Sequence, residues 1–163
     1  MPEPFNPAIL QPGDAILYFK NSFFGWMIAL KTWTKVAHVE IYRGNNTSFA
    51  SRDGLGVNQY RLKLDGVAAI LRPKTELDFA TADLWFQSYA KGQPYDWLGL
   101  LCFTLTRRRG EKNKMFCSEF ATRYYRKAGL VPFNPQWHAD RVPPSFFLVS
   151  PAFYVLWTDG NLF

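Results

Sequence analysis

One cysteine stands where a helix is expected to begin. The stretch "MFCSEFATRYYRKAG" at residues 115–129 has helical spacing of its aromatic residues and places Cys117 in the first turn. Free backbone N–H groups and the positive end of the helix dipole stabilise a thiolate there, and they can also hold a developing oxyanion. Cys117 is therefore a candidate nucleophile for acyl transfer, against the alternative of a buried structural thiol.

A cysteine nucleophile needs a base, and the chain contains 2 histidines. His38 lies in the alternating run "AHVEIY", which predicts a strand with His38 and Glu40 on one face, where a carboxylate can hold the imidazole. His138 lies in the proline-flanked coil "PQWHADRVPP" and is the weaker candidate. We therefore predict His38 as the base and Glu40 as the residue that orients it. A strand histidine satisfied by its neighbours is the alternative.

The segments that would position these residues change from a strand pattern to a helix pattern along the chain. Apolar, partly alternating runs between turn residues predict strands in 12–19, 37–44, 47–62 (two strands around a Gly-rich corner) and 66–73. The last of these is predicted to close an antiparallel meander.

Helical spacing follows in 75–92, where Thr75 and Asp78 give a cap-like start and Gly92 an end, and again in the cysteine helix up to Gly129. The apolar stretch 23–33 predicts a helix of the core or of the active-site wall. The tail, rich in proline and aromatic residues, predicts ordered coil with a short strand.

Composition narrows the class of protein. A chain of 163 residues with 48% hydrophobic and 18% aromatic residues predicts a single folded domain spanning 1–163. The net charge of +6 favours anionic partners, such as a cell-wall polymer or a membrane surface. Nucleic acid is disfavoured because the aromatic residues mostly accompany apolar residues, and the basic run 106–114 fits a solvated loop or a polyanion contact.

Cys102 lies in the apolar "LGLLCFTL" and predicts a buried thiol; we expect no metal site and no cofactor.

The combination of "PGDAILYF", "HVEIYRG", "ASRDGLGV" and "MFCSEFATRYYRKAG" resembles the permuted NlpC/P60 papain-like proteins of the YiiX/YebB-like group. The histidine strand precedes the cysteine helix, which is the permuted order. The resemblance implies an α+β, circularly permuted papain-like fold, with an antiparallel β-meander or barrel packed against helices, Cys117 as nucleophile and His38 as base. The third polar residue of the family would fall near Ala50, which cannot orient an imidazole. Glu40 is the first choice to replace it, with Ser51 or Asp53 as alternatives.

The resemblance also implies a function: a cysteine hydrolase that cleaves an amide bond in peptidoglycan peptides, in a phage or in bacterial wall turnover. Candidate substrate-binding residues are Tyr18, Ser51, Asp53 and Ser118. Two other functions stay open, a lipid acyltransferase or thioesterase like the lecithin–retinol acyltransferase group, and a binding or structural module with a decayed triad. The first residues do not form a secretory signal, so we expect a soluble protein that is cytoplasmic, virion-associated or exported by another route.

Overall fold

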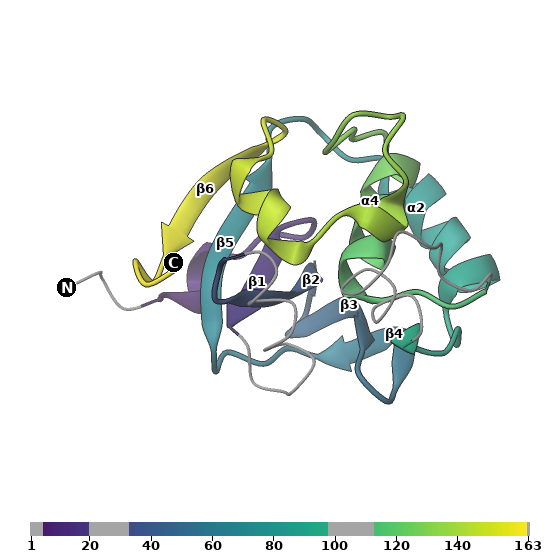
Figure 1. Ribbon diagram of the computed structural model, residues 1–163, viewed down its shortest axis with the longest axis horizontal. Helices are drawn as coiled ribbons and strands as arrows, with labels where there is room; N and C mark the ends of the chain where they lie inside the picture. Colours follow the sequence, from purple (N-terminus) through teal and green to yellow (C-terminus); the bar gives the residue numbers. More distant parts are fainter. Residues whose placement is uncertain (1–4, 20–32, 98–112, 163) are drawn as a thin grey trace.

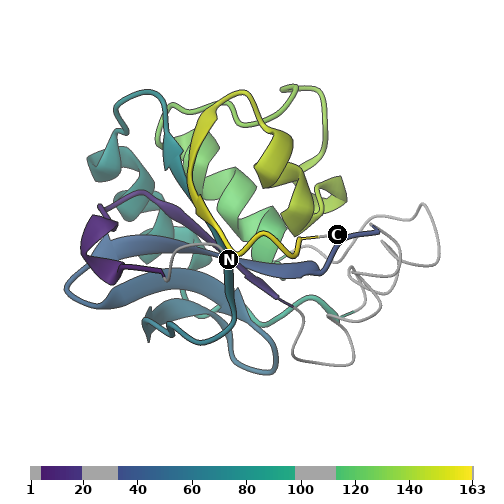
Figure 2. The same ribbon diagram turned by 90° about the vertical axis from the view of Figure 1, so that its left-hand side faces the viewer.

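The computed structural model describes residues 5–19, 33–97 and 113–162. In these ranges the chain forms a six-stranded antiparallel sheet of order β4-β3-β2-β1-β5-β6, with its main helices on one face (Figures 1 and 2). This confirms the α+β class. The strands are β1 (Ala15–Phe19), β2 (Val36–Gly44), β3 (Thr47–Arg52), β4 (Gly56–Arg61), β5 (Val67–Pro73) and β6 (Phe153–Thr158).

Two helical segments match the helix predictions. The first is α2 (Phe79–Trp85), which continues as a π-helical segment η2 (Phe86–Ala90); the second is α4 (Cys117–Lys127). Helix α2 begins after Asp78, whose carboxylate accepts a hydrogen bond from the Thr81 N–H at 3.0 Å. Three 3-10 turns complete the described elements: η1 (Pro7–Ile9), η3 (Ala139–Arg141) and η4 (Pro144–Val149). The predicted helix in 23–33 and Cys102 lie outside the described residues, except for the last residue of that stretch.

The predicted meander needs one correction. Strands β2, β3 and β4 follow one another across the sheet, but β5 does not pair with β4 and instead returns to pair with β1, with Ile16 opposite Ile70. The reason is burial: the stretch from Val67 to Leu71 is buried throughout, which suits a strand with neighbours on both sides. Within the described part of the chain the sheet is open, with β4 and β6 as its edges.

A two-residue turn fixes the register between β2 and β3. Asn45 and Asn46 have φ values of 49° and 58°, as both central residues of a type I′ turn require, and asparagine tolerates this left-handed region better than most residues. Ile41 lies opposite Phe49 and Tyr42 opposite Ser48. The turn, together with a register shift between Tyr42 and Gly44, therefore decides which residues of β3 share a face with His38.

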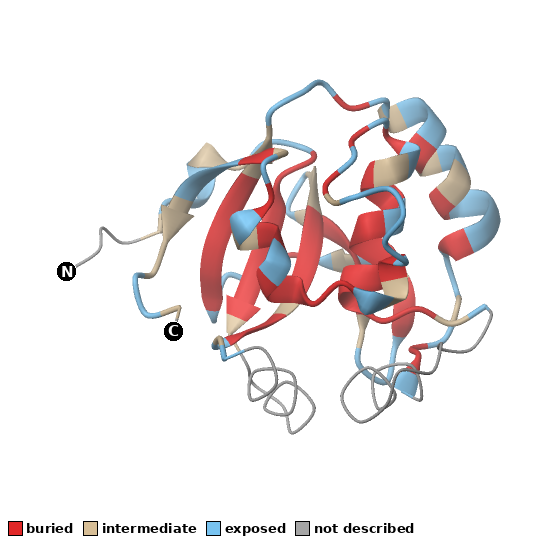
Figure 3. Ribbon diagram, turned by 45° about the horizontal axis from the view of Figure 1, so that its top comes forward, coloured by how far each residue is buried: buried red, intermediate tan, exposed pale blue. Residues whose placement is uncertain are grey.

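The core lies between the sheet and the helices, where Figure 3 shows buried residues on both. Aromatic rings fill it: the Phe49 and Phe86 rings stack with centroids 3.9 Å apart, and Phe120 meets Phe86 edge-on. The Tyr125 hydroxyl, fully buried beneath α4, donates to the Gly13 carbonyl at 2.8 Å. Burial of this many large rings is the main force that holds α4 against β2 and β3.

Candidate active site

Helix α4 begins at Cys117 because the residue before it, Phe116, has the extended values φ −91° and ψ 172°. The side chain of Phe116 makes no capping hydrogen bond, so it leaves the N–H groups of the first turn open. The thiol of Cys117 is free, and the residue is only 1% exposed. Glu119, in the same turn, carries a charge that the helix dipole favours and pairs with Arg123 at 2.6 Å.

A β-bulge in β2 lies directly beside the thiol. Tyr18 pairs with His38 and Phe19 with Val36, so Ala37 is the extra residue of the bulge. The Cys117 Sγ lies 4.0 Å from the Ala37 carbonyl oxygen. Bulges bend a strand locally and re-aim its side chains, and here the bulge adjoins the residue that must reach the thiol, His38.

The His38 imidazole is held by Glu40. Its Nε2 lies 3.0 Å from Glu40 Oε1, and the side chain of His38 is 25% exposed while that of Glu40 is 3% exposed. With Nε2 engaged by the carboxylate, Nδ1 is the nitrogen left to face Cys117. The arrangement has the order thiol, imidazole, carboxylate that a cysteine nucleophile requires.

Two residues of β3 complete the environment of Glu40. Arg52 donates two hydrogen bonds, from Nε to Oε1 at 2.7 Å and from Nη2 to Oε2 at 3.0 Å. The Ser48 hydroxyl donates to Oε2 at 2.5 Å. Both oxygens of this buried carboxylate are therefore fully paired, as a buried charge demands.

These contacts set the charges of the site. Burial alone would lower the pKa of His38, but the Cys117 thiolate, by charge and by hydrogen bonding, and then Glu40 raise it to about 10. Burial alone would raise the pKa of Glu40, but hydrogen bonds from His38, Arg52 and Ser48 lower it to about 2. With these pKa values the imidazole is a cation and the Glu40 carboxylate an anion at neutral pH.

Two tyrosines border the pair. The Tyr18 ring lies 5.8 Å from the His38 ring between centroids, but its hydroxyl donates to the Lys63 carbonyl at 2.9 Å. Burial, and then the charge of Glu40, raise the pKa of Tyr18. The buried Tyr95 lies close enough to Cys117 for the thiolate charge to raise the pKa of its phenol, after burial, which is the larger cause. Sequence reasoning did not single out Tyr95.

The other predicted binding residues are not all at the site. Ser51 is fully buried, and its hydroxyl donates to the Met115 carbonyl at 2.5 Å, which ties β3 to the segment before α4. Ser118 is fully buried and donates to the Val142 carbonyl at 2.5 Å. Asp53 is exposed in the turn after β3. The pKa of its carboxyl is raised, because partial desolvation outweighs the opposing charge of His38. Ala50 is fully buried, and Ser48 and Arg52, two residues to either side, supply the polar groups instead.

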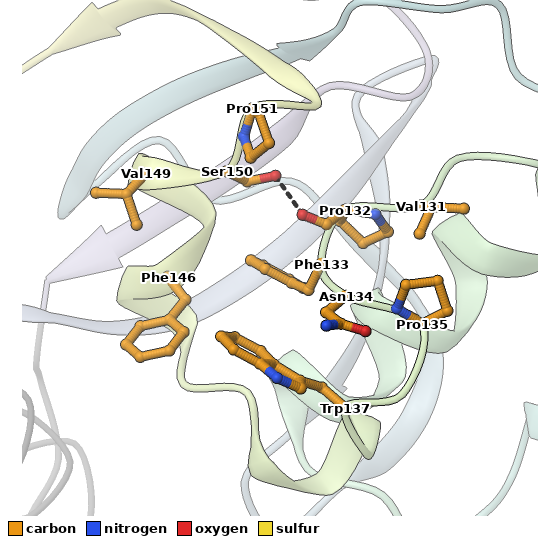
Figure 4. A pocket seen from close by; sticks show the side chains of 10 residues that line it. All are labelled: Val131, Pro132, Phe133, Asn134, Pro135, Trp137, Phe146, Val149, Ser150 and Pro151. Atoms are coloured by element: carbon orange, nitrogen blue, oxygen red, sulfur yellow. Dashed lines mark hydrogen bonds between the residues drawn. The ribbon is translucent and has the colours of Figure 1, made fainter.

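The second histidine belongs to another region. His138 lines a small pocket with Gln136, Trp137, Arg141 and Phe146, and Trp137 and Phe146 also line a neighbouring apolar pocket of about 440 Å³ (Figure 4). Prolines and aromatic residues form most of the wall of that larger pocket, and its Ser150 hydroxyl is bonded to the Pro132 carbonyl at 2.6 Å. Neither pocket is lined by Cys117, His38 or Glu40.

Comparison with known proteins shows similarity to a solved structure. No family model matches the chain, and no curated protein matches it. The crystal structure of YiiX from Escherichia coli O157:H7, described as a metalloprotein and as DUF1105, superimposes with a TM-score of 0.64. The alignment covers 91% of this chain and 97% of YiiX at 16% identity. At this identity the similarity shows a shared fold, which agrees with the resemblance to the YiiX-like group.

Two further properties concern metals and membranes. Within residues 5–19, 33–97 and 113–162, no group of three or more His, Cys, Asp or Glu side chains is arranged to hold a metal ion. None of the helices in these same ranges is long and apolar enough to cross a membrane.

Proposed function

We propose that the protein is a cysteine hydrolase of circularly permuted papain-like fold that cleaves an amide bond. One observation carries the proposal: the His38 imidazole lies 3.0 Å from the Glu40 carboxylate, and Cys117 is near enough to raise the pKa of the imidazole by charge and by hydrogen bonding. A buried imidazolium paired with a thiolate at a helix N-terminus is the resting state of a cysteine nucleophile. The chain order, histidine strand before cysteine helix, supports the permuted arrangement.

The proposed reaction has two steps. The thiolate of Cys117 attacks the amide carbonyl carbon, and the N–H groups at the start of α4 hold the oxyanion. His38 gives its proton to the departing amine as the C–N bond breaks, which leaves a thioester on Cys117. His38 then takes a proton from water as the water oxygen attacks the thioester, and the C–S bond breaks to restore thiolate and imidazolium.

The substrate class rests on the resemblance to NlpC/P60 proteins, whose members act on peptidoglycan peptides. The net charge of +6 supports an anionic wall polymer as the surface on which the enzyme works. We therefore propose an amide bond in a peptidoglycan peptide as the scissile bond.

The test is release of peptide fragments from purified peptidoglycan, followed by mass spectrometry. We expect the native chain to release them, Cys117→Ala and His38→Ala to release none while keeping the native circular dichroism, and Cys102→Ala to act as a matched cysteine control with full activity. Activity retained in Cys117→Ala would contradict the proposal. Release of fatty acid from phospholipid vesicles without release of wall peptides would contradict the amide substrate and favour a lipid acyl site.

A further inference from the structure

Arg52 is held more firmly than an ordinary surface arginine. Besides its two hydrogen bonds to Glu40, its Nη2 donates to the Arg61 carbonyl at 3.1 Å, and its guanidinium lies over the Tyr60 ring, 4.4 Å from the centroid. The side chain is 14% exposed. A planar guanidinium fixed on three sides can act as a constant positive charge in a set position.

This charge alters the balance at His38. The site holds four charges that alternate in sign: the Cys117 thiolate, the His38 imidazolium, the Glu40 carboxylate and the Arg52 guanidinium. Without Arg52, Glu40 would keep the hydrogen bond from the neutral Ser48 hydroxyl, and its charge would be balanced by His38. Because Arg52 donates to both carboxylate oxygens, the negative charge of Glu40 interacts with the Arg52 guanidinium as well as with the His38 imidazole.

The division of the Glu40 charge between Arg52 and His38 matters after the thiolate has reacted to form the thioester. In the thioester intermediate of the proposed reaction, Cys117 carries no charge, and His38 must be neutral to take a proton from water. A buried carboxylate with no other partner would keep the imidazole protonated and stall this step. We propose that Arg52 is a positioning residue that offsets the charge of Glu40, so that Glu40 orients His38 without retaining its proton in the thioester state. The inference rests on the proposed function.

Other groups around His38 must be considered. Tyr18 faces it from β1, Asp53 influences it from the turn after β3, and Tyr95 lies within the electrostatic reach of Cys117 and Asp53. The tyrosines are neutral at working pH because their pKa values are raised. Asp53 is exposed, so its charge is screened more than that of the buried Glu40. Arg52 and Glu40 are thus the charges that dominate when the thiolate is absent.

The test is an NMR titration of His38 in a Cys117→Ser background, which reproduces the neutral state of the thioester and needs no turnover. With only 2 histidines in the chain, His138→Gln assigns the signals. We expect added Arg52→Gln to move the His38 midpoint upward by about one pH unit, and added Glu40→Gln to move it downward by a similar amount. Arg52→Lys keeps the charge and should leave the midpoint within a few tenths of the reference.

A midpoint that is unchanged or falls in Arg52→Gln would overturn the proposal, because Arg52 would then act only by holding Glu40 in place. Should Arg52→Gln not fold, Arg52→Lys decides: a fall to the Glu40→Gln midpoint overturns the proposal, and a midpoint near the reference supports it. Since the titration requires no substrate, these outcomes are independent of whether the protein cleaves peptidoglycan.

Discussion

At the scale of single residues, the site is defined by what each hydroxyl and carboxylate of β2 and β3 contacts. Ser48 and Ser51 lie three residues apart on β3, and both are buried hydroxyl donors with 2.5 Å hydrogen bonds. The partner of Ser48 is the Glu40 carboxylate, whereas the partner of Ser51 is the Met115 backbone. The first bond therefore belongs to the proposed catalytic network and the second to the scaffold.

This difference predicts a split between two alanine variants. Each should lower the free energy of unfolding by about 1–2 kcal/mol, the usual cost of a lost buried hydrogen bond. Ser48→Ala should also lower kcat by roughly tenfold, because a less restrained Glu40 orients His38 poorly. Ser51→Ala should keep kcat and KM within threefold of the native values. A tenfold rise in KM for Ser51→Ala at native stability would instead support its predicted role in substrate binding.

Cys117, His38 and Glu40 could be predicted from sequence because a helix start and a two-residue alternation are local patterns. The roles of Ser48 and Arg52 were not predicted, because their contacts with Glu40 depend on the register across the Asn45–Asn46 turn. Two asparagines after a glycine indicate a two-residue hairpin, but counting from it pairs Ser48 with Arg43. The register shift between Tyr42 and Gly44, which places Ser48 opposite Tyr42, has no local signal in the sequence. Tyr95 comes within electrostatic reach of Cys117 through the tertiary fold, which no local sequence pattern predicts.

At the scale of elements, the path of the chain after β4 decides how the site is assembled. A run of apolar residues such as β5 predicts a strand but carries no information on its neighbours, so its pairing with β1 could not be read from the sequence. The short segment after η2 runs back along β4, where the Val57 N–H donates to the Gln93 carbonyl and the Gly92 N–H to the Val57 carbonyl, both at 2.8 Å. This segment leads directly to Tyr95 beside the thiol.

Gly56 makes that close approach possible. It has φ +76°, and a Cβ atom there would lie 2.3 Å from the Gln93 carbonyl oxygen. Gly54 has a similar φ of +72° but no atom within 4 Å of its Cβ position, so it is a matched control for backbone strain alone. We expect Gly54→Ala to cost about 1 kcal/mol and Gly56→Ala at least 3 kcal/mol in urea unfolding. Equal costs would show that the approach of Gln93 to β4 does not constrain the fold.

At the scale of the whole molecule, two buried carboxylates give stability opposite dependences on pH. The pKa of Glu40 is lowered to about 2, so its contribution is present above about pH 4.5 and is lost as the pH falls toward 2. Burial raises the pKa of Glu119 to about 7 against the opposing charge of Arg123. For Glu119 the native state favours the protonated form, so stability declines as the pH rises from about 4.5 to 7.

The Glu119 effect predicts a stabilising substitution. Its Oε2 is buried and has no hydrogen-bond partner among the described residues, and glutamine has a similar shape without the charge. We expect Glu119→Gln to raise the free energy of unfolding at pH 8 by at most about 3 kcal/mol, and to make little difference at pH 4. Urea unfolding at both pH values measures this, with Glu76→Gln, an exposed site, as a control for the change in net charge. A variant less stable than the native chain at pH 8 would show that the Arg123 pair outweighs burial.

The central claim is that Cys117 and His38 form a thiolate–imidazolium pair, and the most direct measurement is the alkylation rate of Cys117 by iodoacetamide as a function of pH. In a Cys102→Ala background, we expect a rate that is already near its maximum at pH 6–7. The same chain unfolded in urea, and the His38→Gln variant, should instead show a rate that rises through about pH 8.5, as for a free thiol. A native rate that rises through pH 8.5, unchanged by His38→Gln, would contradict the account.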